Sequence, residues 1–361
     1  MIIIVMVAFY QWFYVGNSRN KLNGKNIEPE RAFDVFYVIM KCMENQEVIN
    51  KMEKHVEIGK TGLQVAPIGF GANTIGAHNL FQNIDEDVSR ETLRVALAEG
   101  VDFFDSAFMY GLGRSEELIG EVLAETGRRS DVVLATKAAH VVTGSNVTLD
   151  NAPTFLTESV DKALKRLETD YIDLFYIHFP DGVTPPDEAV GALQRLKEAG
   201  KIRAIGLSNF SMDALKLANK DGYVDVVQDK YSLVYPGLEE DMIPYCVEQG
   251  ISFIPYTPLA SGLLTGKFAA SNPPQDFRKE RPHFQGQTYI DITAKVDSLQ
   301  NLANQHSTSI ANIVLATTIT INGVDVVIPG AKSPEQVRAN MKTLQVTLTH
   351  EEVMQVRALF K

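Results

Sequence analysis

The stretch TDYIDLFYIHFPD, residues 169–181, carries the pattern on which the fold prediction rests. From Ile172 to Phe179 it is almost continuously apolar, and such runs are typical of parallel strands buried on both faces of a sheet. His178 lies near the end of this run. Taken alone, it is compatible with a core histidine whose ring nitrogens are bonded by neighbours. The rest of the chain favours a functional role for it.

Seven further apolar runs resemble this one, and together they predict eight strands. The strands are IGFGA from Ile68, VDFFDSA from Val101, VVLATK from Val132, IDLFYIHF from Ile172, IRAIGLSN from Ile202, VDVVQDKY from Val224, ISFIPYTP from Ile251 and VDVVIPG from Val324. Amphipathic helical patterns follow them, starting near Ser89, Ser115, Thr154, Pro186, Ser211, Glu239, Ile292 and Ser333. Ser, Thr and Pro are typical of helix starts.

Eight strand-then-helix units without a break predict an α/β fold, a (β/α)8 TIM barrel. Before the first strand, VEIGKTGLQVAPIG predicts a β-hairpin that closes the bottom of the barrel. We expect the barrel domain to span residues 52–361, with residues 1–51 as an N-terminal extension.

The extension leaves several interpretations open. Its opening MIIIVMVAFYQWFYV is apolar, but Gln11 interrupts it and it is shorter than the roughly 20 residues of a spanning helix. No basic segment precedes it, which disfavours a signal peptide or anchor without removing either. The extension is alternatively disordered, or translation begins at Met52. Residues 46–48 can be encoded by a purine-rich run that resembles a bacterial ribosome-binding site.

Composition excludes several classes of partner. Hydrophobic residues make up 45% and charged residues 22% of the chain, as in globular proteins. A net charge of -11 argues against nucleic acid and against anionic membranes. Cys42 and Cys246 lack His or Cys neighbours at metal-binding spacing, so we predict no metal site and a reducing, cytoplasmic location. We expect a monomer or a weak homo-oligomer.

Titratable residues stand at the ends of three consecutive predicted strands. Asp105 ends the second strand, Lys137 the third and His178 the fourth, while Tyr110 follows in the loop after Asp105. Taken alone, each residue also has an ordinary structural explanation, such as a capping aspartate, a surface lysine or a half-buried tyrosine. Because barrel enzymes build their sites at the carboxyl ends of the strands, the four together predict a shared catalytic site.

Polar and aromatic residues at later strand ends predict a cofactor site. Ser208 and Asn209 end strand five and Gln228 ends strand six, with side chains that can bond a nicotinamide carboxamide. Tyr256 offers a flat ring for stacking on the nicotinamide. The alternative for Ser208 and Asn209 is a helix cap before Met212.

After strand eight the sequence has the features of a phosphate site. Gly330 lets the backbone approach a phosphate, Lys332 supplies a cation, and Ser333 precedes a helix whose N-terminus favours anions. Lys332 suits the 2'-phosphate of NADP, and no acidic residue is evident to hold the ribose of NAD. We therefore predict NADP as the cofactor.

These motifs resemble those of the aldo-keto reductases. The strand-end motifs are FDSAFMYGLGRSEELIG, LATK, YIHFPD and GLSNF, and the cofactor segments are IPYTPLASGLLTGKF and VIPGAKSPEQVRAN. The resemblance covers essentially all of residues 52–361. It is closest to the bacterial branch associated with inositol-utilisation operons, in HNLFQNIDED, YGLGRSEELIGEVL, TDYIDLFYIHFPD and ISFIPYTPLASGLLTGK. The resemblance implies an NADP-dependent oxidoreductase that reduces aldehydes or ketones.

It also implies roles for residues. Tyr110 resembles the general acid, Lys137 would lower its pKa from about 10, Asp105 would hold the lysine, and His178 would orient the carbonyl. Further cofactor-binding positions implied by the resemblance are Pro258, Leu259, Ser261, Gln336 and Asn340. Ala339 replaces the glutamate of many relatives, which puts one adenine contact in doubt.

Alternatives stay open for both the function and the substrate. A protein of this kind can instead be an NADPH-binding sensor or regulatory subunit with little turnover. The residues expected at the mouth are apolar and aromatic, so they accept many carbonyl compounds: Ala107, Phe108, Met109, Phe179 and Tyr235. Before the eighth strand, VLATTITING contains β-branched threonines, which predict a short or loosely packed helix.

Overall fold

The computed structural model describes residues 21–22, 25–26 and 55–361. The chain divides into two units, Met1–Val48 and Ile49–Lys361. In the first unit β1 (Lys21–Leu22) pairs antiparallel with β2 (Lys25–Asn26). The interpretations of residues 1–51 as an anchor, a disordered segment or untranslated sequence lie outside the described residues.

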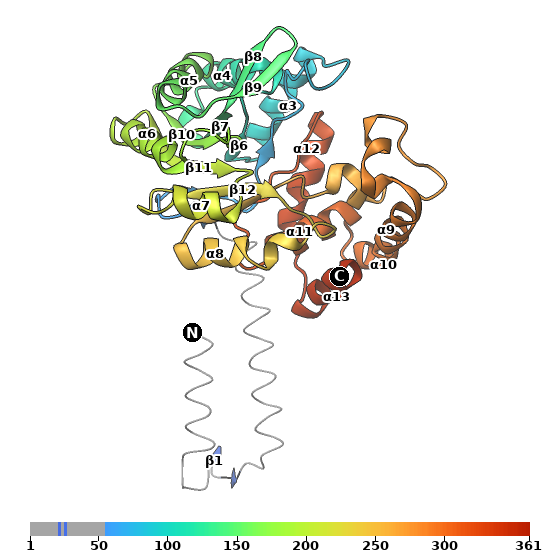
Figure 1. The fold of residues 1–361 in the computed structure, drawn as a ribbon. Helices are drawn as coiled ribbons and strands as arrows, with labels where there is room; N and C mark the ends of the chain where they lie inside the picture. The colour runs from blue at the N-terminus through green and yellow to red at the C-terminus, as the bar shows by residue number, and fades with distance from the viewer. Residues whose placement is uncertain (1–20, 23–24, 27–54) are drawn as a thin grey trace. The chain divides into compact units, whose positions relative to one another are not determined.

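The second unit is built on a parallel sheet of seven strands. Their order is β13-β12-β11-β10-β7-β6-β5. The strands are β5 (Phe70–Gly71), β6 (Phe103–Asp105), β7 (Val133–Ala138), β10 (Ile172–Ile177), β11 (Ile202–Ser208), β12 (Val226–Lys230) and β13 (Ser252–Tyr256). Each falls inside a predicted run except β7, which extends one residue beyond its run to Ala138, and Figure 1 shows α5 to α8 on the outside of these strands.

Residues 324–330 close the sheet into a barrel. Val324 bridges to Phe253 on one edge, and Val327 bridges to Ile68 on the other. The Val327 N–H donates to the Pro67 carbonyl at 3.0 Å, and the Gly69 N–H donates to the Val327 carbonyl at 2.8 Å. Pro329 has no N–H, which interrupts regular pairing here. The eighth predicted strand therefore exists as isolated bridges, and the (β/α)8 barrel is confirmed.

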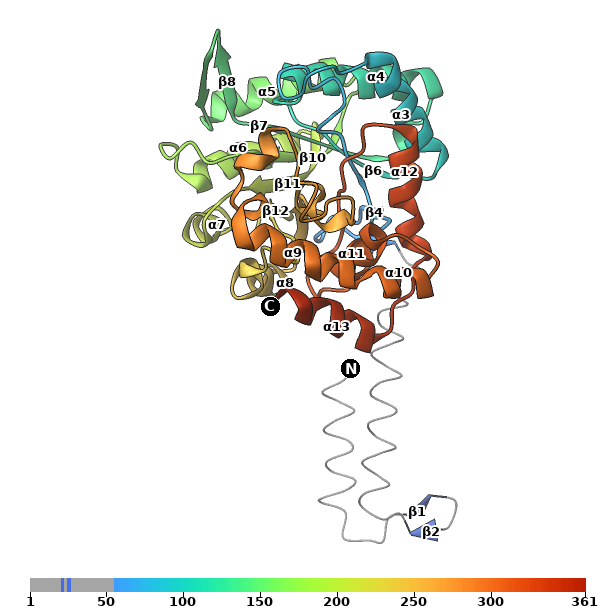
Figure 2. The ribbon, with the colours of Figure 1, turned by 90° about the vertical axis from the view of Figure 1, so that its right-hand side faces the viewer.

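Helices follow the strands as predicted, with differences at their starts. The helices are α3 (Glu86–Ala98), α4 (Arg114–Thr126), α5 (Pro153–Arg166), α6 (Pro186–Glu198), α7 (Met212–Ala218), α8 (Met242–Gln249), α9 (Gly286–Ser298), α10 (Gln300–Gln305), α11 (Ile310–Ile319), α12 (Pro334–Met341) and α13 (His350–Phe360). α3 starts earlier than predicted because the Asp85 carboxylate caps it. Figure 2 shows α9 to α13, in orange and red, gathered on one side of the barrel.

Helix α11 differs from its prediction. It was expected to be short or loosely packed, yet it has ten residues, and Thr317 and Thr318 in it are fully buried. The Thr318 hydroxyl donates to the Val314 carbonyl at 2.8 Å, which satisfies it inside the helix. Burial of an almost entirely apolar helix outweighs the low helix propensity of threonine.

The core has two layers, and the N-terminal hairpin completes the inner one. Inside the barrel, side chains such as Phe103 and Leu174 form one cluster, which Ile58 and Leu63 of the hairpin join. The hairpin pairs β3 (Val56–Glu57) with β4 (Gln64–Val65). Larger numbers of apolar side chains pack between strands and helices. The hairpin thus closes one end of the barrel, as predicted.

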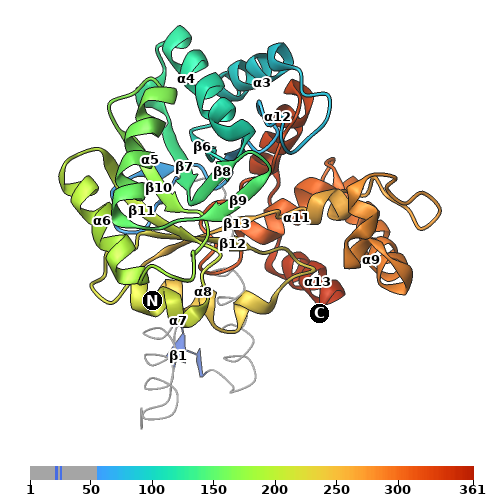
Figure 3. The ribbon, with the colours of Figure 1, turned by 45° about the horizontal axis from the view of Figure 1, so that its top comes forward.

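One element was not predicted. Directly after β7, the strands β8 (His140–Thr143) and β9 (Asn146–Leu149) form an antiparallel hairpin, which Figure 3 shows beside the ends of β6 and β7. Its turn contains Gly144 with φ 62°. Among the described residues, no helix is long and apolar enough to span a membrane.

Candidate active site

A buried ion pair occupies the carboxyl ends of β6 and β7. The Lys137 ammonium donates to Asp105 Oδ1 at 2.5 Å and to the Ser106 carbonyl at 2.8 Å. Asp105 and Lys137 are 2% and 1% exposed. From β12, the Gln228 amide donates to Asp105 Oδ2 at 2.9 Å. The carboxylate is therefore held from two sides, which fixes the position of the lysine.

The electrostatics of Lys137 reflect this burial. Removal from water lowers the pKa of the Lys137 ammonium, while the Asp105 carboxylate opposes that change. The ammonium lies 5.7 Å from the centre of the Tyr110 ring and 5.2 Å from that of Tyr176. Aromatic faces attract cations, so both rings favour the charged lysine.

Tyr110 lies in the loop between β6 and α4. Gly111, at φ 71°, shapes this loop, and a Cβ atom there would lie 2.1 Å from the Gly76 carbonyl oxygen. The Gly111 N–H donates to Asn79 Oδ1 at 2.8 Å. A tight glycine turn with a side-chain bond therefore fixes the Tyr110 backbone.

The pKa of Tyr110 differs from the prediction. Burial of the hydroxyl raises its pKa above the ordinary value, and the charge of Asp105 raises it further. We expected Lys137 to lower it. The difference arises because desolvation is the largest effect on this hydroxyl and the negative charge of Asp105 acts in the same direction. Tyr110 is therefore a neutral phenol at neutral pH.

His178 directly follows β10 and faces the same site. Its ring lies edge-on to that of Tyr110, with 6.3 Å between the centres. Burial lowers the pKa of His178 well below its usual value, and the charge of Lys137 lowers it further. The imidazole is neutral at pH 7. Its Nδ1 is enclosed and has no partner among the described residues.

Sequence reasoning missed a second histidine at this site. His140, the first residue of β8, has its ring centre 5.0 Å from that of His178 and 5.5 Å from that of Phe179. Burial lowers the pKa of His140 too. The sequence signal for His140 was its position three residues after Lys137. The hairpin that carries it, however, has no clear alternation of apolar and polar residues.

The predicted nicotinamide residues bond one another in this structure. Asn209, at φ 62°, donates to the His178 carbonyl at 3.0 Å and to Ser208 Oγ at 2.9 Å. The Tyr256 hydroxyl donates to Asn209 Oδ1 at 2.8 Å. Strands β10, β11 and β13 are thus linked at one edge. Gln228 differs from expectation, since its amide nitrogen already donates to Asp105 Oδ2.

The loop after β13 has an unusual backbone. Pro258 and Leu259 lead into it, and Thr257, Ala260 and Ser261 have φ values of 55°, 48° and 59°. Positive φ is rare outside glycine and costs about 1–3 kcal/mol per residue. Such cost is tolerated where a backbone must follow a ligand, so this loop fits a binding role.

The phosphate residues lie next to the closing seam. Gly330 bridges to Gly71, and a Cβ atom at Gly330 would lie 2.7 Å from Asn73 Oδ1. The Asn340 amide donates to the Gly330 carbonyl at 3.4 Å. The Lys332 N–H donates to Gln336 Oε1 at 3.0 Å. Ser333 precedes α12 and its side chain does not cap that helix.

Three further cations gather here that sequence reasoning missed. Arg281 donates to Ser261 Oγ at 2.5 Å, and Arg278 donates to the Ser261 carbonyl at 3.2 Å. Burial lowers the pKa of Lys267, and the nearby charges of Arg278 and Lys332 add to this. The signal for Arg278 and Arg281 was the basic run FRKER from residue 277.

The cluster carries more positive charge than the protein neutralises. Arg278 pairs with Asp276, but within residues 55–361 no carboxylate pairs with Lys267, Arg281 or Lys332. Four cations gathered around one carboxylate, Asp276, fit a ligand with several phosphates. The residues present therefore fit a phosphorylated dinucleotide.

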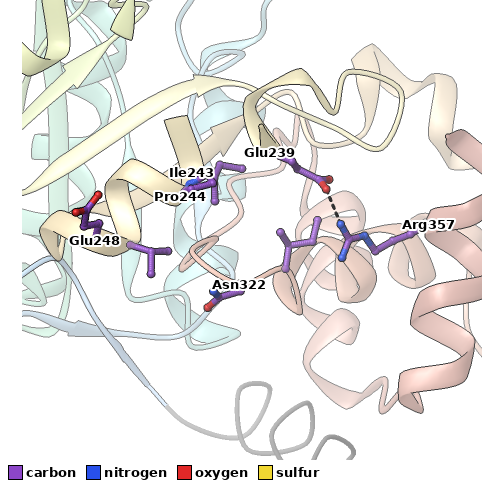
Figure 4. A pocket seen from close by; sticks show the side chains of 8 residues that line it. Glu239, Ile243, Pro244, Glu248, Asn322 and Arg357 are labelled. Carbon is purple, nitrogen blue, oxygen red and sulfur yellow. Dashed lines mark hydrogen bonds and ion pairs between the residues drawn. The ribbon is translucent and has the colours of Figure 1, made fainter. Parts of the chain in front are cut away.

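Two further observations concern metal-binding groups and a second pocket. In the described part of the chain, no group of His, Cys, Asp and Glu could hold a metal ion. A pocket of about 380 Å³ lies elsewhere, between α8 and the Arg357 region of α13. Figure 4 shows that Glu239 and Arg357 in its wall pair with each other, at 2.5 Å, so they offer no free charge to a ligand.

A closed (β/α)8 barrel with a Tyr, Lys, Asp and His group at the strand ends defines a class of barrel oxidoreductases. The model of the Aldo/keto reductase family matches residues 67–361. The chain belongs to this family, and it is an oxidoreductase.

Curated relatives cover most of the chain. Aldo-keto reductase YhdN of Bacillus subtilis is 32% identical over 85% of this chain and 94% of its own. Aldo-keto reductase yakc [NADP(+)] of Schizosaccharomyces pombe is 34% identical over 82% of this chain and 89% of its own. A probable voltage-gated potassium channel subunit beta of Oryza sativa is 32% identical, over 85% and 96%.

Solved structures agree. The glycerol dehydrogenase AKR11B4 from Gluconobacter oxydans has a TM-score of 0.78 at 30% identity, covering 85% of this chain and 94% of that one. An aldo/keto reductase from Klebsiella pneumoniae, in complex with NADP and acetate, has a TM-score of 0.65 at 27% identity, covering 85% and 95%.

Proposed function

We propose that this protein reduces aldehydes or ketones to alcohols with NADPH, and that Tyr110 is the general acid. The observation that carries the proposal is the buried Lys137–Asp105 pair beside the Tyr110 ring. The names of relatives that bind NADP support the choice of cofactor. When bound, the cofactor supplies a hydride to the carbonyl carbon.

Tyr110 suits proton donation. Its raised pKa keeps the phenol protonated at neutral pH, so a proton is available for the alkoxide oxygen. Donation leaves a phenolate, which the Lys137 ammonium near the ring stabilises. Asp105 and the Ser106 carbonyl keep that ammonium in place throughout.

His178 suits orientation of the carbonyl. Its Nδ1 is enclosed and has no hydrogen-bond partner among the described residues, so Nε2 is the ring atom that can serve a substrate. With the proton of the neutral ring on Nε2, this N–H would donate to the carbonyl oxygen. Two donors, Tyr110 and His178, then converge on one oxygen.

The cofactor is proposed to lie along the linked strand ends. Ser208, Asn209 and Gln228 would hold the carboxamide and Tyr256 the nicotinamide ring. The loop residues Pro258, Leu259 and Ser261 would follow the phosphates. The adenosine end would contact Gly330, Lys332, Ser333, Gln336 and Asn340, together with Lys267, Arg278 and Arg281.

The test is Tyr110→Phe, which removes the acid and keeps the ring. NADPH affinity should persist, while carbonyl reduction falls by roughly 10²- to 10⁴-fold. Cofactor fluorescence titration and NADPH oxidation with an aldehyde panel measure the two quantities. Full turnover in the variant would reject Tyr110 as the acid.

A second candidate function rests on one comparison. Relatives named as potassium channel β subunits make a cofactor-binding sensor or regulatory subunit the alternative. This alternative predicts tight NADPH binding with negligible turnover of every carbonyl tested by wild-type protein. The panel that tests Tyr110 therefore separates the two functions.

Several finer assignments stay proposals. Placement in the inositol-operon branch rests on the quoted motifs, and a cytoplasmic, monomeric or weakly oligomeric protein without nucleic-acid partners rests on composition. We also propose a barrel domain from Met52 and an extension of residues 1–51. A chain that begins at Met52 should melt at the same temperature and bind NADPH equally well. A large loss of either would reject that boundary.

A further inference from the structure

A second ion pair lies close to the Tyr110 loop, between α4 and α5. Arg166 Nε donates to Glu116 Oε2 at 2.6 Å. Glu116 is fully buried, and the Arg166 side chain is 19% exposed. The other oxygen of Glu116 accepts from the Thr136 hydroxyl at 2.7 Å. Carbonyl reduction as proposed above gives this pair no task, and a buried ion pair is by itself weak evidence for stability.

Arg166 contacts the loop on both sides of Tyr110. A Cβ atom at Gly113 would lie 2.6 Å from Arg166 Cδ, so the loop backbone lies directly against the arginine side chain. The guanidinium carbon lies over the Phe108 ring, 5.2 Å from its centre, where an aromatic face attracts a cation. The Gly113 N–H donates to the Phe108 carbonyl at 2.7 Å, which closes the turn that contains Tyr110.

The loop needs contacts of this kind to keep its shape. Leu112 has a φ of 54°, in the left-handed region that is unfavourable for residues other than glycine. Such a conformation persists only where the surroundings hold it. Arg166 is the last residue of α5, and its bond to Glu116 gives the long side chain a defined position. A regular helix thereby supports the loop that carries Tyr110.

We propose that Arg166 is a positioning residue for Tyr110, and that Glu116 holds Arg166 in place. Arg166 acts through Phe108 and Gly113 and leaves the reacting atoms to the other residues of the site. The inference rests on the proposed role of Tyr110 as the general acid. A misplacement of about 1 Å costs up to about 100-fold in rate, so the loop needs precise support.

The test is Arg166→Lys. Lysine keeps a positive charge beside Glu116, whose own charge raises the pKa of Lys137, but it lacks the planar group that stacks on Phe108. We expect the single-turnover rate of NADPH oxidation, with the aldehyde that wild-type protein reduces fastest, to fall roughly 10- to 100-fold. NADPH affinity in fluorescence titrations should stay the same. A rate within twofold of wild type would overturn the proposal.

Arg129→Lys is a matched control at the other end of the strands. Arg129 is 18% exposed and pairs at 2.8 Å with Asp173, which is 1% exposed, and it lies over the Tyr171 ring at 4.1 Å. It donates to the carbonyls of Val132 and Tyr171, which precede β7 and β10. Both substitutions should lower the melting temperature, but only Arg166→Lys should slow the reaction. Equal rates in the two variants would reduce Arg166 to a structural role.

Amide hydrogen exchange examines the loop without turnover. Peptides that span residues 108–113 should exchange faster in Arg166→Lys than in wild-type protein and in Arg129→Lys. Unchanged exchange in Arg166→Lys would overturn the proposal. If Tyr110→Phe keeps full turnover while the exchange result holds, only the role of Tyr110 as the acid is rejected. If Arg166→Lys does not fold, the double variant Glu116→Gln/Arg166→Gln, which leaves no unpaired charge, replaces it with the same expectation.

Discussion

Replacing Asp105 with asparagine probes the ion pair at the centre of the site. The asparagine side chain would keep the shape and an acceptor but remove the charge, leaving Lys137 as a buried cation without a counter-ion. Removing one member of a buried pair costs about 3–5 kcal/mol, which corresponds to a fall in melting temperature on the order of 10 °C. Asp105 is 2% exposed, so solvent cannot compensate.

The double variant Asp105→Asn/Lys137→Met isolates the pair. Methionine removes the orphaned cation and fills similar space, so the double variant should be more stable than Asp105→Asn alone. Chemical denaturation of wild type, both single variants and the double variant measures the coupling. If the Asp105→Asn variant loses less than about 1 kcal/mol, or the double variant is the weaker one, the interpretation of the buried pair is wrong.

The pH dependence adds a signed check. Burial lowers the pKa of Lys137 in the folded protein, and Asp105 opposes this shift. Without Asp105 the folded pKa is lower still, while the unfolded lysine keeps its proton up to about pH 10.4. Unfolding then takes up a proton, so stability rises with pH. The loss caused by Asp105→Asn should therefore shrink between pH 7 and pH 10.

Three further results are expected. The lowered pKa of His178 means that unfolding takes up a proton below about pH 6.5. The free energy of unfolding should therefore decrease as the pH is lowered in this range, by up to about 1.4 kcal/mol per pH unit. His178→Phe should flatten that slope in acid denaturation curves. Lys332→Ala should weaken NADPH binding about 10- to 100-fold and change NADH binding little, as measured by fluorescence titration. The control is Lys279→Ala, in the same basic region and without a described side-chain contact, which should change the affinity for neither cofactor. Gly206→Ala would place a Cβ atom 2.2 Å from the Tyr176 ring, so calorimetry should show about 1–3 kcal/mol of destabilisation, and an unchanged melting temperature would contradict the packing.

The sequence predicted those features that follow from local periodicity and strand position. Asp105, Lys137 and His178 came from the end of each apolar run, and the barrel then brought them together. The Tyr110 pKa was predicted with the wrong sign because it depends on the balance of burial and two opposing charges. The environment of His140 could not be predicted, because its neighbours come from β10 and its hairpin lacks a clear alternation. Likewise, Lys267 comes near Arg278 and Lys332, and Arg281 reaches Ser261, only through the path of long loops.

The bridged seam has a consequence for the order of folding. The Thr74 hydroxyl donates to the Ala331 carbonyl at 2.9 Å across 257 residues of sequence. The contacts that join the first strand to the eighth segment can therefore form only after that last segment is in place. Contacts of such separation form slowly, because loop closure comes before any gain from pairing. A growing chain can assemble the pairs from β6 to β13 early, yet Gly330, Lys332 and α12 reach their places only when the ring closes. The ability to hold phosphates should therefore appear last during refolding, later than most of the helical signal.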